Sequence, residues 1–227
     1  GHTPFGHSGE YILNKICEDG FAHYKQSVRI VEVLEKDGKG LNLTWEVRDG
    51  ILNHRTSSHP STLEGAIVRL SDKIAYINHD IDDAIRARMF TEHELPRGYT
   101  DVLGHSVRER LNNMIHDIIL NSMDKPAITM SEGMEEAMQG LRKWMFDNVY
   151  KNDIPKAEEG KAQNMITQLY EYYMGHVDKL PVEYVLLMVN KGEKKSRVVC
   201  DYIAGMSDIY AIDQFEKLFV PKRWNVY

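Results

Sequence analysis

The chain is poor in cysteine and contains no long apolar run. Cys17 and Cys200 are too few for a disulfide framework or a zinc–cysteine cluster, so we expect a reducing, cytoplasmic location. The longest apolar run, residues 184–189, falls far short of the ~18 residues of a membrane span. The chain also opens on Gly-His-Thr-Pro, without the basic and apolar segments of a signal peptide.

Signatures of several common protein classes are missing. There is no phosphate loop with Gly-Lys-Ser/Thr, no dinucleotide fingerprint and no Gly-x-Ser-x-Gly nucleophile elbow. The 28 Lys and Arg residues against 34 Asp and Glu give a net charge of −6. One short basic cluster, typical of a solvated turn, consists of Lys191, Lys194, Lys195 and Arg197. We therefore expect neither nucleic acid as the main ligand nor a membrane as a partner.

What is present indicates a folded globular protein. Hydrophobic residues make up 42% of the 227 residues and charged residues 27%, which excludes a largely disordered chain. This length fits one domain or two tightly packed subdomains. Ten histidines are present, and nine of them lie in the first 116 residues. Polar chemistry is therefore concentrated in the first half of the chain.

Helical periodicity dominates the sequence, and no alternating strand pattern or internal repeat accompanies it. Helices are predicted over residues 21–35, 43–53, 62–88, 100–121, 132–150, 156–175, 181–190 and 194–219. A His/Ser/Pro loop covers residues 54–60. The sequence thus predicts an all-α fold. The Met, Tyr and Phe residues of its second half are expected in a core or an oligomer contact.

The helix predicted over residues 62–88 has two contrasting faces. At about 100° per residue, Asp72, Tyr76 and Asp80 share one face. That face also carries Lys73 at its border, His79 and Asp83. The opposite face is aliphatic and carries Ile74, Ile77, Ile81 and Ile85. Two interpretations remain open: a solvated acidic face, or a cleft whose carboxylates attract a cation.

The first ten residues form a dense Gly/Pro/His motif. Glu10 follows His7 by three residues, so a helix starting at Ser8 would place the carboxylate beside the imidazole. Such a pair raises the basicity of histidine for proton transfer. The alternative is a structural loop with surface histidines. His23 begins the next predicted helix and is ambiguous by itself.

Three stretches resemble one enzyme family. Residues 1–10 are similar to the segment that directly follows the His-Asp pair of HD-domain deoxynucleoside triphosphate triphosphohydrolases, the bacterial dGTPase-like family. Residues 72–83 resemble the final metal-aspartate helix of that family, and residues 197–208 its C-terminal helix. The resemblance implies an HD-domain helical bundle with additional C-terminal helices. Residues 1–120 would form the C-terminal part of the HD core, and 121–227 a helical subdomain packed on it.

The resemblance also implies roles for single residues at the phosphates. Asp72 matches the aspartate that completes the metal ligand set. Lys73 matches a lysine that contacts the triphosphate. His7 and Glu10 match an acid/base pair near the α-phosphate, and His23 matches a second histidine at that phosphate.

Further implied roles concern the sugar and the base. Tyr76 matches the tyrosine that packs against the deoxyribose and would crowd a 2′-hydroxyl. Asp80 matches the carboxylate that accepts a hydrogen bond from the 3′-hydroxyl. Arg142, Phe146 and Asn148 occupy positions like those of base and phosphate contacts.

The implied reaction is water attack at the α-phosphorus of a dNTP such as dGTP, which releases deoxynucleoside and tripolyphosphate. Mg²⁺ or Mn²⁺ is the expected cofactor. The family's ligand set includes an upstream histidine and a His-Asp pair just before Gly1, so we expect the chain to belong to a longer enzyme. A homo-oligomer and a regulatory nucleotide are further expected partners. The alternatives are another HD-superfamily nucleotide phosphohydrolase, or a non-catalytic nucleotide-sensing module.

Overall fold

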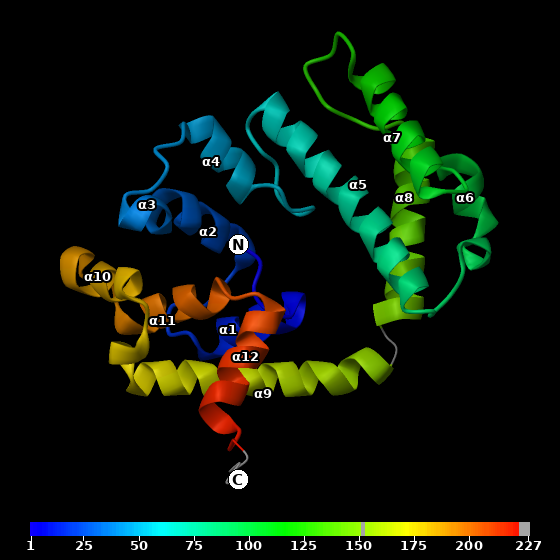
Figure 1. Cartoon of the computed structure of the whole chain (residues 1–227). Coiled ribbons are helices and arrows are strands. Elements are labelled where there is room, and N and C mark those ends of the chain that lie inside the picture. The colour runs from blue at the N-terminus through cyan, green and yellow to red at the C-terminus, as the bar shows by residue number, and fades with distance from the viewer. Residues whose placement is uncertain (151–152, 223–227) are drawn as a thin grey trace. The chain divides into compact units, whose positions relative to one another are not determined.

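The computed structural model describes residues 1–150 and 153–222, with side chains for residues 1–149 and 158–222. Helices make up the regular secondary structure of these ranges, and no strand occurs in them, which confirms the all-α prediction. Within the same ranges, no helix is both long and apolar enough to span a membrane. The chain forms two compact units (Figure 1). The terminal unit comprises Gly1–Leu43 and Lys156–Tyr227, and the middle unit comprises Thr44–Pro155.

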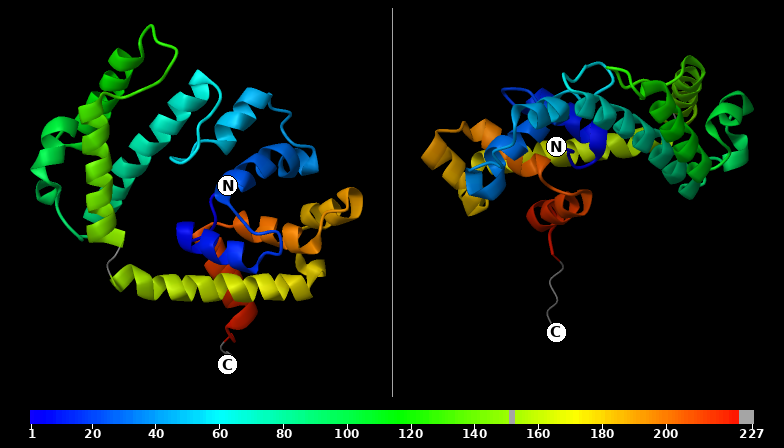
Figure 2. Two further views of the ribbon diagram at one scale, coloured as in Figure 1. Left: turned by 180° about the vertical axis from the view of Figure 1, so that it is seen from behind. Right: turned by 90° about the horizontal axis from the view of Figure 1, so that it is seen from above.

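The terminal unit is built from both ends of the chain. Its N-terminal helices are α1 (Gly6–Ile16), α2 (His23–Arg29), the π-helical η1 (Ile30–Leu34) and α3 (Glu35–Gly38). Its C-terminal helices are α9 (Asp153–Gly175), the 3-10 helix η4 (Val177–Lys179), α10 (Val182–Lys191), α11 (Lys195–Ala204) and α12 (Asp208–Phe219). The left view of Figure 2 shows α9 as one long continuous helix.

The core of the terminal unit surrounds α11, whose residues 198–204 are all buried. Leu13 of α1 and Leu169 of α9 belong to the same apolar cluster. One buried residue of α11 is charged: Asp201 is only 1% exposed. Its carboxylate accepts hydrogen bonds from Arg29 Nε at 2.9 Å and Arg197 Nη2 at 3.1 Å, which compensates for the loss of water. The motif over residues 197–208 therefore contains a buried carboxylate whose pairing with two arginines stabilises the fold.

The middle unit is continuous in sequence. Its helices are α4 (Trp45–Leu52), α5 (Leu63–Arg86), η2 (Glu92–Glu94), α6 (Arg97–Leu103), α7 (Val107–Ser122), α8 (Glu132–Met145) and the π-helical η3 (Phe146–Tyr150). Ile81 of α5, Met114 of α7 and Leu141 of α8 are completely buried in its core. Arg110 is also completely buried, and its Nε donates to Asn78 Oδ1 at 2.9 Å.

Two predicted helices are interrupted in the structure, and the compact units do not follow the predicted domain boundary. The predicted helix 100–121 is divided between α6 and α7, because Gly104 has a φ of 123° and Ser106 caps α7 by accepting from Glu109 N at 3.2 Å. The predicted helix 194–219 is divided in the same way, since Ser207 caps α12. The predicted domain boundary at residues 120 and 121 falls inside α7 and does not coincide with the two compact units.

Candidate functional site

Helix α5 has the two faces that the sequence predicts. Thr62 begins it by accepting a hydrogen bond from Gly65 N at 3.0 Å. The aliphatic face is confirmed, because Ile74, Ile77 and Ile81 are buried in the core of the middle unit. The other face carries a polar stripe, which consists of the exposed Asp72 and Tyr76 and the half-buried Lys73 and Asp80. These four side chains thus come from one side of one rigid helix.

Cations gather around the N-terminal half of this stripe. Burial lowers the pKa of Lys73, and the nearby charges of Arg69 and Arg142 lower it further. Glu135 acts in the opposite direction. An anion such as a phosphate group would relieve the mutual repulsion of these three cations. The sequence-predicted residues Lys73 and Arg142 are therefore electrostatic neighbours, although α5 and α8 supply them separately.

The loop before α5 accepts hydrogen bonds from two of these three cations, Arg69 and Arg142. Arg69 donates from Nε to the carbonyl oxygen of Arg55 at 3.1 Å and from Nη2 to that of Thr56 at 2.7 Å. Arg142 Nη1 donates to Thr56 Oγ1 at 3.3 Å. Sequence reasoning missed Arg69 and Thr56. For Arg69 a signal existed, because it lies four residues before Lys73 and so shares its side of the helix.

Asn148 lies in η3 and is exposed. Its Nδ2 donates to the carbonyl oxygen of Trp144 at 2.8 Å, so the amide turns back toward its own helix. Phe146 is also exposed, with 54% of its surface accessible. The roles predicted for Phe146 and Asn148 stay predictions.

The terminal unit contains a compact histidine–glutamate group. Helix α1 starts at Gly6, two residues earlier than assumed from the sequence. The predicted contact between His7 and Glu10 is present, with His7 Nδ1 3.6 Å from Glu10 Oε2. His23 is the closer partner: its Nδ1 lies 2.9 Å from Glu10 Oε1, and its backbone N donates to the same oxygen at 2.9 Å. Glu10 therefore pairs mainly with His23.

The ionisation of Glu10 follows from this pairing. Burial would raise the pKa of its carboxyl, but hydrogen bonds from His23 and His7 outweigh burial and hold the pKa below its ordinary value. An ionised Glu10 favours the His23 tautomer with its proton on Nδ1. The neutral ring then carries its acceptor on Nε2. Such an imidazole can take up or give a proton at Nε2 while the carboxylate fixes its orientation.

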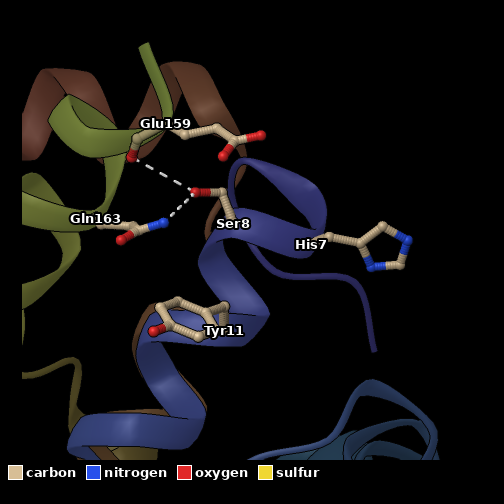
Figure 3. A pocket seen from close by; sticks show the side chains of 5 residues that line it. All are labelled: His7, Ser8, Tyr11, Glu159 and Gln163. Carbon is tan, nitrogen blue, oxygen red and sulfur yellow. Dashed lines mark hydrogen bonds between the residues drawn. The ribbon is translucent and has the colours of Figure 1, made fainter. Parts of the chain in front are cut away.

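A pocket of about 290 Å³ lies in the terminal unit near this group (Figure 3). Helices α1 and α9 supply its lining residues, which are His7, Ser8, Tyr11, Glu159 and Gln163. Ser8 Oγ accepts from Gln163 Nε2 at 3.1 Å and ties the two helices together. In Figure 3 the imidazole of His7 points away from this hydrogen bond. The Glu10–His23 pair is not part of the lining.

The described residues do not form a metal site by themselves. Among them, no group of three or more His, Cys, Asp or Glu residues could hold a metal ion. Asp72 supplies one exposed carboxylate, whereas divalent cations in proteins take about four to six ligands. The predicted ligand therefore does not fit a metal without further donors.

Comparison with known proteins identifies the family. Residues 128–217 match the family described as Phosphohydrolase-associated domain. The chain is 52% identical over 224 residues to the Deoxyguanosinetriphosphate triphosphohydrolase-like protein of Caldanaerobacter subterraneus subsp. tengcongensis, covering 99% of this chain and 66% of that protein. It is 42% identical over 231 residues to the protein of the same name from Clostridium perfringens strain SM101, covering 98% and 67%.

The match to these relatives extends along nearly the whole chain. A third protein of the same name, from Geobacter sulfurreducens, is 34% identical over 277 residues, which cover 97% of this chain and 71% of the relative. The chain thus spans about two thirds of the length of the curated relatives it matches. It belongs to the family of deoxyguanosinetriphosphate triphosphohydrolase-like proteins.

Proposed function

We propose that the protein hydrolyses deoxynucleoside triphosphates such as dGTP, releasing deoxynucleoside and tripolyphosphate. The polar stripe of α5 carries this proposal, because it presents a cation, an aromatic ring and a carboxylate in sequence along one side of a helix. The names of the relatives point to the same class of substrate.

The proposal gives each stripe residue a task. Lys73 binds the phosphates, and the neighbouring positive charge of Arg142 adds to the attraction. Tyr76, 39% exposed, offers its ring to the deoxyribose and crowds a 2′-hydroxyl. Asp80 accepts a hydrogen bond from the 3′-hydroxyl. Because the helix rises 1.5 Å per residue, Lys73 and Asp80 are about 10 Å apart along its axis. That separation allows one residue to bind phosphate while the other binds the sugar.

Proton transfer falls to the histidine–glutamate group. Water attacks the α-phosphorus, the bond from phosphorus to the 5′-oxygen breaks, and the departing 5′-oxygen needs a proton. A protonated His7 can supply it, while neutral His23 takes the proton that the attacking water gives up. Glu10 keeps its hydrogen bond to Nδ1 of His23 and stabilises the imidazolium that forms when the ring takes a proton from water.

A requirement for Mg²⁺ or Mn²⁺ is part of the proposal, with Asp72 as the ligand that this chain contributes. Such a cation would orient the phosphates and lower the pKa of a bound water. Asp72 alone supplies too few ligands for such a cation, so none of the steps described above depends on the metal. Removal of metal with a chelator, followed by addition of Mg²⁺ or Mn²⁺, tests the requirement separately from the roles of Lys73 and Tyr76.

One observation favours a second candidate, a nucleotide-sensing module without turnover. No group of three metal-ligating side chains occurs among the described residues.

Incubation of the full-length protein with dGTP and Mn²⁺, followed by chromatography of the products, distinguishes the hydrolase from the sensing module. The proposed hydrolase yields deoxyguanosine and acts much more slowly on GTP. Formation of dGDP would contradict this reaction, and tight dGTP binding without any product would favour the sensing module. Equal rates on GTP and dGTP would favour another nucleotide phosphohydrolase.

A further inference from the structure

Arg69 extends the polar stripe of α5 by one turn. It precedes Lys73, Tyr76 and Asp80 by four, seven and eleven residues, a spacing that places all four on one side of a helix. At 1.5 Å per residue, Arg69 lies about 6 Å beyond Lys73 along the axis. The proposed order from Asp80 to Lys73 runs from sugar to phosphate, so Arg69 lies beyond the phosphate end.

The guanidinium of Arg69 is directed at the backbone of the loop before α5. Nε and Nη2 donate to the carbonyl oxygens of two successive residues, Arg55 at 3.1 Å and Thr56 at 2.7 Å. A planar guanidinium presents its donors in a fixed fork, and two such bonds hold a loop in one orientation. A lysine has a single ammonium at the end of a flexible chain and cannot reproduce this geometry. Arg69 therefore fixes the position of Thr56.

Thr56 in turn contacts a residue of the proposed site. Its hydroxyl oxygen accepts from Arg142 Nη1 at 3.3 Å, although 86 residues separate the two in sequence. Arg142 is exposed, and a long exposed side chain has many rotamers, which binding must restrict. The bond to Thr56 selects among these rotamers before a ligand arrives. A continuous line of hydrogen bonds thus runs from α5 through the loop to α8.

We propose that Arg69 is a positioning residue for triphosphate binding: it holds Thr56, and Thr56 orients Arg142 so that Arg142 and Lys73 bind the same phosphate chain. This inference rests on the proposed function. The role of Arg69 is indirect, because its Nε and Nη2 donors already serve backbone carbonyls. The ligand class is a chain of phosphates, and inorganic tripolyphosphate is its simplest representative.

Four variants of the full-length protein distinguish the effect of the hydrogen-bond geometry of Arg69 from the effect of its positive charge. Arg69→Gln removes the fork and the charge, Arg69→Lys removes only the fork, and Thr56→Val removes only the hydroxyl. Arg86→Gln is the matched control, because Arg86 lies on the same helix far along the axis from Arg69, where it pairs with Asp82 and lies 3.7 Å from Asp83. For each variant, KM and kcat with dGTP and the Kd of tripolyphosphate by calorimetry are measured. Thermal unfolding establishes that each variant is folded.

The three test variants are expected to raise KM and the tripolyphosphate Kd about tenfold, with kcat within about twofold of the wild type. Arg86→Gln is expected to change neither constant. Combining Thr56→Val with Arg142→Ala should weaken binding no more than Arg142→Ala alone, because both changes remove the same hydrogen bond between Thr56 and Arg142.

If Arg69→Lys binds as tightly as the wild type, the positive charge of Arg69 rather than its geometry is responsible, and the inference is overturned. Wild-type constants in Thr56→Val, which leaves the charge and the helix intact, would overturn it as well.

The inference and the proposed function fail in different ways. If the wild type hydrolyses dGTP but Thr56→Val and Arg69→Gln keep its KM, the function stands and the positioning role is lost. If the wild type shows no turnover while the tripolyphosphate Kd follows the expected order, the positioning role stands and the hydrolase is lost.

Discussion

Two helices of this molecule carry similarly dense polar motifs, and they use them in opposite ways. In α11, Asp201 is buried and its carboxylate is occupied by Arg29 and Arg197. In α5, Asp72 and Tyr76 are exposed on the side opposite the buried isoleucines. Burial therefore separates a motif that maintains the fold from one that can meet a ligand. This distinction predicts which substitutions reduce stability and which reduce activity.

The largest expected effect is the loss of activity in Asp72→Ala. Removal of the proposed metal carboxylate should lower kcat/KM for dGTP about a thousandfold or more. Because Asp72 is exposed, the free energy of unfolding should change by less than about 0.5 kcal/mol. Steady-state kinetics and urea unfolding of one preparation measure both quantities.

The matched control for this variant is Asp83→Ala. Asp83 is a carboxylate on the same helix with 75% of its side chain exposed, and it should be dispensable for both activity and stability. Wild-type activity in Asp72→Ala would make the metal assignment wrong.

Asp201→Ala should show the reverse pattern, with a loss of about 3 kcal/mol in the free energy of unfolding. The variant leaves the guanidinium groups of Arg29 and Arg197 without their shared carboxylate inside the terminal unit. Urea unfolding measures the loss. Asp213→Ala, which removes an exposed carboxylate of α12, should change stability by less than about 0.5 kcal/mol. If the two variants were equally stable, the buried network would contribute nothing and the contrast with α5 would disappear.

Tyr76→Ala should have a smaller effect, confined to the selectivity between deoxyribose and ribose. Without the ring, the preference for dGTP over GTP in kcat/KM should fall about tenfold, because nothing crowds the 2′-hydroxyl. Tyr76→Phe keeps the ring and should keep the preference. The ratio of initial rates on the two nucleotides measures it. An unchanged ratio in Tyr76→Ala would remove the tyrosine from the sugar contact.

The smallest expected effect concerns acid stability. The pKa of Glu10 is lowered in the folded protein, so its pairing with His23 stabilises the fold above the ordinary pKa of 4.5, and this contribution is lost as the pH falls through the lowered value. The His23→Phe variant should have a higher Glu10 pKa than the wild type. The pH-dependent part of its free energy of unfolding should be smaller by less than about 1 kcal/mol. NMR titration of the Glu10 carboxyl measures the shift. Because residue 23 keeps its backbone N–H donor to Glu10 in this variant, part of the lowering remains, and a pKa identical to that of the wild type would show that the imidazole contributes nothing.

Local physics explains what the sequence predicted. The 3.6-residue period was enough to place Ile77 and Ile81 in the core and Asp72 on the opposite face of α5. Position in sequence also gave the contact between His7 and Glu10, which are three residues apart in one helix. Even the missed division at Gly104 had a local signal, since Ser106 and Glu109 have the spacing of a helix cap.

Tertiary contacts explain what was missed. Thr56 and Arg142 meet only because the folded middle unit brings α8 to the loop before α5. The pairing of Glu10 with His23 depends on the turn between α1 and α2, which helical periodicity does not describe. Likewise, the sequence could not tell that Asp201 is buried. Charge and motif identify polar residues, but only packing decides whether they face each other or a ligand.

Phosphorus NMR of the reaction of the full-length protein with dGTP tests the central claim most directly. The resonances of the reaction products show which phosphate bond is broken. Hydrolysis at the α-phosphorus predicts tripolyphosphate as the first phosphorus-containing product, with no other species growing in at the same rate. Orthophosphate or pyrophosphate in its place would contradict the proposed function.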